Sequence, residues 1–219
     1  MNENPEKLRK FTLPVNSYLK RKTDCYFILN YLRYGVPGNP EFILTLKNTF
    51  NSESVDNLRR AKNRVVELLT KHTPYVMKNA GISCCTMVCV PRAKEFDTYT
   101  KNQMYLLDGV SEAARQLSNV TDGTGAIVRT VSTKTTHFRK PVERVTSNGE
   151  REANTGKDPY PGITKDTCKI DTEAIRGKTI LLVDDIYTAG VNIDEDCIQA
   201  LYNAGAEKVV LFTLSYTTV

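Results

Sequence analysis

The chain has 219 residues, of which 40% are hydrophobic and 25% charged, and its formal net charge is +5. This length allows a full hydrophobic core, and no apolar run approaches the length of a membrane span, which excludes a membrane-spanning helix. The mild basic excess suits an anionic ligand, whereas the lack of a basic run with interleaved aromatic residues argues against nucleic acid as a partner.

The cysteines indicate a reducing compartment and no structural zinc. Six cysteines, at positions 25, 84, 85, 89, 168 and 197, form no C-x-x-C pair, and the chain has two histidines. This pattern argues against a zinc site. Cys84, Cys85 and Cys89 lie in or beside an apolar run, so we interpret them as small buried thiols. The polar, charged first residues do not resemble a secretory signal, and we expect a cytoplasmic protein.

The first 80 residues are predicted to form a helical appendage. Residues 1–23 are rich in Lys, Asn and Glu and are expected to be a weakly ordered lead-in. The apolar run 25–32 could be a strand or a helix, because periodicity does not separate the two in a short run. Residues 54–71 are predicted to be a helix, since apolar residues recur there at three- and four-residue steps: Leu58, Ala61, Val65, Leu68 and Leu69.

From residue 81 the pattern changes to alternating strands and helices. Strands are expected at 84–90, 125–132, 168–170, 179–183 and 209–214, and helices at 102–117 and 192–203. Such alternation predicts an α/β domain over 81–219, with a mainly parallel, twisted sheet flanked by helices. Residues 133–166 are polar and strongly basic, and a loop of this length inside a compact domain is often functional or disordered.

The most informative stretch is the end of the strand at 179–183. The apolar run 180–183 is followed by Asp184 and Asp185, then by the loop 188–190 (Thr-Ala-Gly) and a helix-like segment. This order brings two carboxylates and a set of backbone amides to the edge of the sheet where α/β folds bind ligands. Carboxylates can hold sugar hydroxyls or a hydrated cation, and the loop amides can hold a phosphate. The segment therefore predicts a sugar-phosphate site.

The same segment resembles the PRPP-binding motif of type I phosphoribosyltransferases. That motif has four apolar residues, two acids, two apolar residues, and a Thr/Ser-rich loop with a central Gly. Within this family the chain is most similar to the ComF-like, amidophosphoribosyltransferase-like class, and the likeness covers residues 81–219. Tyr187 stands where a smaller aliphatic residue is common, and Asn192 where Thr or Ser is common. Because Asn is a good N-cap, Asn192 is expected to keep the local geometry.

The resemblance implies an enzyme that transfers 5-phosphoribosyl from PRPP to a nitrogenous base or amine, with Mg²⁺ and with release of pyrophosphate. Asp184 and Asp185 would hold the ribose hydroxyls and contact the cation directly or through water. Since adjacent strand residues face opposite sides, the two acids need not act alike. The 5′-phosphate would bind the loop Thr188, Ala189, Gly190, Val191 and Asn192, and the pyrophosphate would bind Arg92, Ala93 and Lys94.

The long basic loop and the first 80 residues have expected roles as well. In the family a flexible loop closes over bound substrate, and residues 133–166 are the candidate for this lid. Arg139, Lys140 and Arg144 would reach the pyrophosphate from it. The appendage would supply the hood, the region that contacts the acceptor. The partners are then PRPP and a small-molecule acceptor, with no membrane, and a homodimer is possible because family members often dimerise.

Two other functions stay open from the sequence. The first is a regulatory protein that binds PRPP without turnover, because the lid and the residues at 187 and 192 depart from the usual pattern. The second is a nucleic-acid-associated factor, which the mild basic balance and the competence link of the ComF-like class suggest. A receiver domain also carries two acids after an apolar strand, but too little chain follows Asp185 for the rest of that fold.

Overall fold

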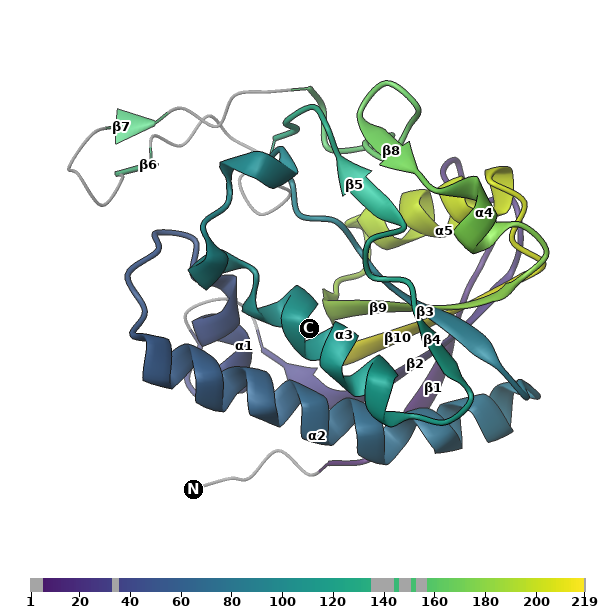
Figure 1. Ribbon diagram of the computed structural model, residues 1–219, viewed down its shortest axis with the longest axis horizontal. Helices are drawn as coiled ribbons and strands as arrows, with labels where there is room; N and C mark the ends of the chain where they lie inside the picture. The colour runs from purple at the N-terminus through teal and green to yellow at the C-terminus, as the bar shows by residue number, and fades with distance from the viewer. Residues whose placement is uncertain (1–5, 33–35, 135–143, 146–150, 153–156, 219) are drawn as a thin grey trace.

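Figure 1 shows the computed structural model of the chain, which describes residues 6–32, 36–134, 144–145, 151–152 and 157–218. Its centre is a six-stranded sheet in the order β1-β2-β10-β9-β3-β4. The strands are β1 (Arg9–Leu13), β2 (Thr23–Tyr31), β10 (Lys208–Thr217), β9 (Thr179–Tyr187), β3 (Cys85–Cys89) and β4 (Val120–Asp122). All neighbours are parallel except β1 and β2, which are antiparallel. The predicted α/β class with a mainly parallel sheet is confirmed.

Helices cover both faces of this sheet. In Figure 1, α2 (Val55–Ala80) and α3 (Tyr105–Gln116) lie below it, with α1 (Glu41–Lys47) beside them, and α5 (Ile193–Asn203) and α4 (Thr172–Ile175) lie above it. Alternate residues of β9 pack against the helices on the two faces of the sheet. Leu181 and Val183 belong to the core cluster with α2 and α3, whereas Ile180 and Leu182 belong to the cluster with α5. Both faces of β9 are therefore apolar, as expected for a buried parallel strand.

Smaller elements surround the carboxyl ends of the central strands. The 3-10 turns η1 (Phe96–Thr98) and η2 (Lys101–Gln103) connect β3 to α3. The antiparallel pair β5 (Ile127–Arg129) and β8 (Cys168–Ile170) packs on the α5 side. A second short pair, β6 (Arg144–Val145) and β7 (Arg151–Glu152), lies to the upper left in Figure 1, away from the central sheet.

The N-terminal segment differs from the prediction of a helical appendage. β2 pairs in parallel with β10, with Cys25 opposite Leu211, and β1 covers the edge of β2. The apolar run at 25–32 is thus a strand buried on both faces, a pattern that a buried helix segment shares. The expectation of a weakly ordered lead-in at 1–23 is also wrong for residues 9–13, which form β1. The sheet contains strands from both sides of the predicted boundary near residue 80.

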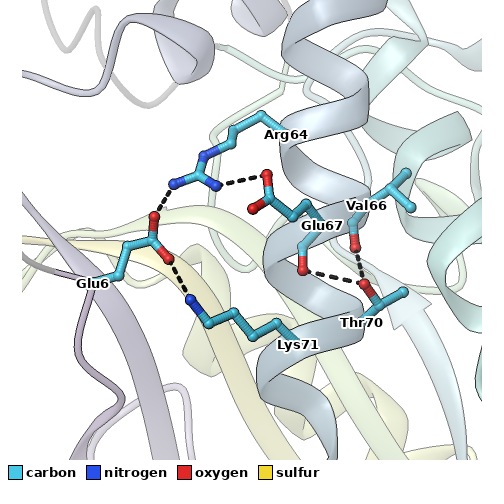
Figure 2. Close-up of polar contacts among 6 residues, drawn as sticks. All are labelled: Glu6, Arg64, Val66, Glu67, Thr70 and Lys71. Carbon is cyan, nitrogen blue, oxygen red and sulfur yellow. Dashed lines mark hydrogen bonds and ion pairs between the residues drawn. The ribbon is translucent and has the colours of Figure 1, made fainter.

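Ion pairs fix the start of the chain to α2. The carboxylate of Glu6 accepts hydrogen bonds from Arg64 and from the Lys71 ammonium, the latter at 3.0 Å, and Arg64 also pairs with Glu67 (Figure 2). Each such pair is partly exposed and contributes a few tenths of a kcal/mol to about 1 kcal/mol. Their joint effect is to hold the segment before β1 beside the helix.

Helix α2 is longer than the predicted 54–71. Ser54 caps its start, with a hydroxyl that accepts from the Asn57 amide at 3.2 Å, and Gly81 caps its end, with a φ of 64° in the left-handed form common after helices. Its buried stripe continues through Val76 and Met77, past Pro74 inside the helix. Packing of this second half outweighs the tendency of proline to end a helix.

Two further comparisons concern the cysteines and the membrane. Cys85 and Cys89 are buried as predicted, but Cys84 is exposed because it precedes β3 rather than lying in it. Within the part of the chain that the structure describes, no helix has both the length and the apolar character needed to cross a bilayer.

The close approach of β3 and the turn after β4 requires a glycine at 123. A Cβ at Gly123 would lie 2.4 Å from Thr86 Cγ2 and 3.2 Å from the carbonyl oxygen of Met87, whereas a Cβ at Gly125 would meet no atom within 4 Å. We expect Gly123→Ala to lower the free energy of unfolding by about 1–3 kcal/mol, because the strand must shift. Urea denaturation measures this, and Gly125→Ala is the matched control. Equal stability of the two variants would contradict the packing described.

Candidate functional site

The two predicted motifs lie on neighbouring strands where the chain changes direction. β3 and β9 are paired, with Cys89 opposite Val183, and the Val90 amide donates to the Val183 carbonyl at 2.9 Å. From β3 the chain crosses through α3 to β4 on one side, and from β9 it crosses through α5 to β10 on the other. The loops therefore diverge and open a crevice at the carboxyl ends of these two strands.

A cavity of about 210 Å³ occupies this crevice. Residues of both motifs line it: Asp184, Asp185, Thr188, Val191, Arg92, Ala93 and Lys94. The structure thus brings together the acids and the basic loop that the sequence analysis assigned separately. Among the described residues, Ala189, Gly190 and Asn192 complete the loop after β9 without lining the cavity, and Gly190 takes a φ of 80° that favours glycine.

The two acids are part of a strand that is longer than predicted. β9 continues to Tyr187 because β10 pairs with it as far as Tyr216, so the predicted end at Val183 is wrong. Asp185 faces α1, where its Oδ2 lies 3.0 Å from Nζ of Lys47. Asp184 faces α5 and shares a hydrogen bond with the carboxyl group of Asp194. The expectation that adjacent acids point to opposite faces is confirmed.

Asp184 and Asp194 share a strongly perturbed environment. Burial raises the pKa of Asp184 to about 7, and the charge of Asp185 adds to that effect. Burial and the neighbouring Asp184 likewise raise the pKa of Asp194. Asp194 is 1% exposed, and its Oδ1 has no hydrogen-bond partner among the described residues, although the residue lines the cavity. A ligand hydroxyl in the cavity is a suitable partner for this buried oxygen.

Lys47, at the end of α1, balances the charge of the acids by direct contact with Asp185. Burial lowers the pKa of Lys47, but the negative charges of Asp185 and Asp184 outweigh that effect and raise it overall. Lys47 therefore stays protonated and holds the Asp185 carboxylate in place. The sequence analysis did not identify this residue, because nothing in the sequence near Lys47 indicates its contact with β9.

The first turn of α5 carries three buried acids, which changes how a phosphate can bind there. Besides Asp194, Glu195 accepts from the Tyr187 hydroxyl at 3.2 Å, and Asp196 accepts from the Gly162 and Ile163 amides at 2.6 and 2.8 Å. These carboxyl groups offset the positive end of the helix dipole. A phosphate at this edge would therefore meet the loop 188–192 rather than the helix end, and within that loop the Val191 amide already donates to the Thr188 carbonyl at 3.0 Å. Asn192 occupies the N-cap position, but its side chain makes no capping hydrogen bond.

Arg92 has a connecting role that the sequence did not reveal. Its guanidinium donates to the carbonyl oxygens of Gln103 at 2.5 Å and Lys47 at 2.6 Å, and it lies 4.6 Å from the centre of the Tyr99 ring. The Tyr99 hydroxyl in turn accepts from the Lys94 amide at 2.9 Å. Arg92 therefore joins the end of α1 to η2 across one wall of the cavity, and any ligand contact it makes adds to this structural role.

Arg129 is the cation that sequence reasoning missed. It is 3% exposed and lines the cavity. Its Nε donates to the Arg92 carbonyl at 2.6 Å and its Nη1 to the Gly162 carbonyl at 2.9 Å, while Nη2 is buried with no hydrogen-bond partner among the described residues. A buried, always charged guanidinium with an unsatisfied donor is expensive unless an anion binds it. The sequence signal for this residue was the presence of an arginine within an apolar run that is predicted to be a strand.

The predicted lid is described only in part. Thr133 and Lys157 form a bridge at the base of the long loop, and Thr133 donates to the Ala93 carbonyl at 2.7 Å, which places this base at the cavity. Arg144 lies in β6, paired with β7. Arg139 and Lys140 lie outside the described residues.

Comparison with known proteins adds no assignment: no protein-family model and no curated protein matches this chain.

The perturbed pKa of Asp184 predicts a pH-dependent stability. The native carboxyl has a pKa of about 7 against 3.8 for the unperturbed group, so between these values the folded state binds more protons than the unfolded state. The free energy of unfolding therefore falls as the pH rises through this window. We expect Asp184→Asn to remove the penalty and to raise stability by about 1–2 kcal/mol at pH 8, with little gain at pH 4.

Urea denaturation at the two pH values measures this difference. Asp158→Asn is the control, because the Asp158 side chain is 81% exposed. A gain for Asp184→Asn that is the same at pH 4 and pH 8 would contradict the assignment of a buried, perturbed carboxyl.

Proposed function

We propose that this chain is a type I phosphoribosyltransferase that transfers 5-phosphoribosyl from PRPP to a nitrogenous base or amine and releases pyrophosphate. The observation that carries the proposal is the single cavity lined by both predicted motifs, one after β3 and one at the end of β9. A ligand with a phosphate, vicinal hydroxyls and a second phosphate group matches the donors and acceptors that line this cavity.

Each part of PRPP has a counterpart in the site. The 5′-phosphate binds beside the loop 188–192, where Thr188 lines the cavity and presents a hydroxyl that lies 2.7 Å from that of Thr217. Asp184 and Asp185 accept the ribose hydroxyls, and Lys47 holds Asp185 in position. Nη2 of Arg129 provides a buried donor for the pyrophosphate.

These residues also account for catalysis. As the bond from C1 to pyrophosphate breaks, positive charge develops on the ribose ring, and nearby carboxylates stabilise it. The pyrophosphate leaves with the electron pair, and guanidinium and ammonium groups stabilise the departing charge. Because all these groups are held by backbone and ion-pair contacts before substrate binds, catalysis consists mainly of positioning and electrostatics. No cysteine is required as a nucleophile.

The site fits a magnesium ion that is bound mainly by the substrate. The described residues contain no group of three or more His, Cys, Asp or Glu side chains arranged to hold a metal. Asp184 and Asp194 nevertheless present buried carboxyl oxygens at the cavity, and Oδ1 of Asp194 lacks a partner among the described residues. Mg²⁺ prefers such oxygens together with waters and substrate phosphates. When bound, it would neutralise charge on the leaving pyrophosphate.

A regulatory protein that binds PRPP without turnover is the second candidate. The observation in its favour is that Arg92, assigned to the pyrophosphate, already donates to two backbone carbonyls. A nucleic-acid-associated factor is the third candidate, and strong, salt-dependent DNA binding would distinguish it.

The first test is calorimetric titration of PRPP with and without Mg²⁺. We expect magnesium-dependent binding that the double variant Asp184→Asn, Asp185→Asn weakens at least tenfold, equivalent to about 1.4 kcal/mol. Asp158→Asn is the matched control for loss of a carboxylate. Absence of binding by folded wild-type protein would refute the proposal, whereas binding without pyrophosphate release across a panel of bases and amines would favour the regulatory protein.

The second test separates the two phosphate subsites through Arg129. We expect Arg129→Met to weaken the binding of inorganic pyrophosphate at least tenfold and to leave ribose 5-phosphate binding unchanged, because only the pyrophosphate meets Nη2. Arg129→Lys keeps the charge and should weaken pyrophosphate binding less. Arg59→Met is a surface control. Equal weakening of both ligands would show that Arg129 acts on the fold and not on one subsite. Thermal denaturation of each variant checks that it is folded.

A further inference from the structure

A second cavity, of about 200 Å³, lies on the other side of the segment that follows β3. Pro91, Arg92 and Lys94 line both cavities and form the wall between them. The rest of the second cavity comes from η1, the start of α3 and the turn before β5. Neither the sequence motifs nor the proposed function assigns it a role.

The lining of this cavity is suited to an aromatic ring that carries no positive charge. Phe96, Met104, Leu107 and Ile127 line it but not the first cavity, and none of its lining residues, all of which are described, is acidic. The charged residues that it contains, among them Arg129, all lie on the shared wall. A cation has no partner of opposite charge here, and an apolar body fits with hydrogen-bond acceptors turned toward the wall.

The volume and the aromatic lining of the second cavity suit a compact planar ligand. A closed apolar cavity of about 150 Å³ is sufficient for benzene, so about 200 Å³ is sufficient for one ring or two fused rings. Phe96 and Tyr99 both line this cavity with aromatic rings. Aromatic faces of this kind bind planar rings by offset or edge-to-face contact.

We propose that this apolar cavity is a second small-molecule site, which binds an aromatic ring compound of one or two rings that carries no positive charge. The proposal goes beyond the sugar-phosphate cavity and holds whether or not the chain transfers ribosyl groups. Because the two cavities share the Arg92 wall, a bound ring lies next to a bound sugar phosphate. It is then placed either as a molecule that is consumed or as an effector that changes the affinity for the sugar phosphate.

Gly125 offers a direct test of the site. It lines the second cavity and not the first, its φ is not in the left-handed region, and a Cβ there would meet no atom within 4 Å. Gly125→Leu should therefore fill the apolar cavity without straining the backbone. Gly125→Ala fills less of it, and Val15→Leu is a remote surface control, since Val15 is 59% exposed.

The experiment measures binding of indole and benzimidazole by ligand-observed NMR, with benzoate and benzylammonium as charged comparators. We expect the two uncharged rings to bind wild type and the Val15→Leu variant, and Gly125→Leu to weaken them at least tenfold while it remains folded and binds PRPP as wild type does. Binding that is unchanged in Gly125→Leu, or preferred binding of benzylammonium, would overturn the proposal. So would no binding of either ring to wild type at millimolar concentration.

A final arm adds PRPP and Mg²⁺ to the bound ring and follows both by NMR. Consumption of the ring identifies the cavity as the acceptor site: a ring nitrogen forms the bond to C1, the bond from C1 to pyrophosphate breaks, and the N–H proton leaves to the pyrophosphate. An unchanged ring that alters PRPP affinity identifies an effector site. Failure of PRPP to bind would refute the proposed function alone, because ring binding is measured first without PRPP.

Discussion

The parallel pairing of β3 with β9 is the constraint on which the site depends. It places the residues after one strand beside the carboxylates of the other, although nearly half of the chain separates them. The crossovers through α3 and α5 then run in opposite directions, so the chain itself leaves a crevice there. The core on both faces of β9 holds this arrangement rigid, and the loops at its end take the geometry that the strands set.

The charges buried at this crevice are costly for the fold and useful for a ligand. Asp185 has a partner in Lys47, whereas Asp184 and Asp194 compete for a proton, and Arg129 keeps one donor without a partner among the described residues. A folded protein retains such groups at the expense of stability when they serve a site. An anionic, hydroxyl-rich ligand would satisfy the acids and the guanidinium together, and this is the physical content of the proposed phosphoribosyltransferase.

The sequence predicted the parts of the structure that local pattern controls. The apolar run before Asp184, the helix at 192–203 and the basic loop after the strand at 84–90 lie where periodicity and turn residues placed them. The strand nature of 25–32 was not predictable, since a run buried on both faces has no period. The extension of β9 to Tyr187 comes from pairing with β10. The strand propensity of the β9 residues alone does not predict this pairing.

The side-chain partners of the site needed the tertiary structure. Lys47 contacts Asp185 across most of the chain, and Arg129 stands in an apolar run where a lone arginine does not show whether it faces solvent or a cavity. The contact of Asp194 with Asp184 joins α5 to β9, and no sequence motif specifies it. Local sequence can thus place a motif on the sheet, but the groups that complete the site come from distant elements.

We propose that both motifs form one site for the two ends of PRPP. Phosphorus NMR of PRPP can distinguish the two ends, because the 5′-phosphate and the pyrophosphate give separate resonances. We expect wild-type protein with Mg²⁺ to shift or broaden the resonances of both groups in the same concentration range. Perturbation of one group alone, or of both at different concentrations, would contradict a single site formed by β3 and β9.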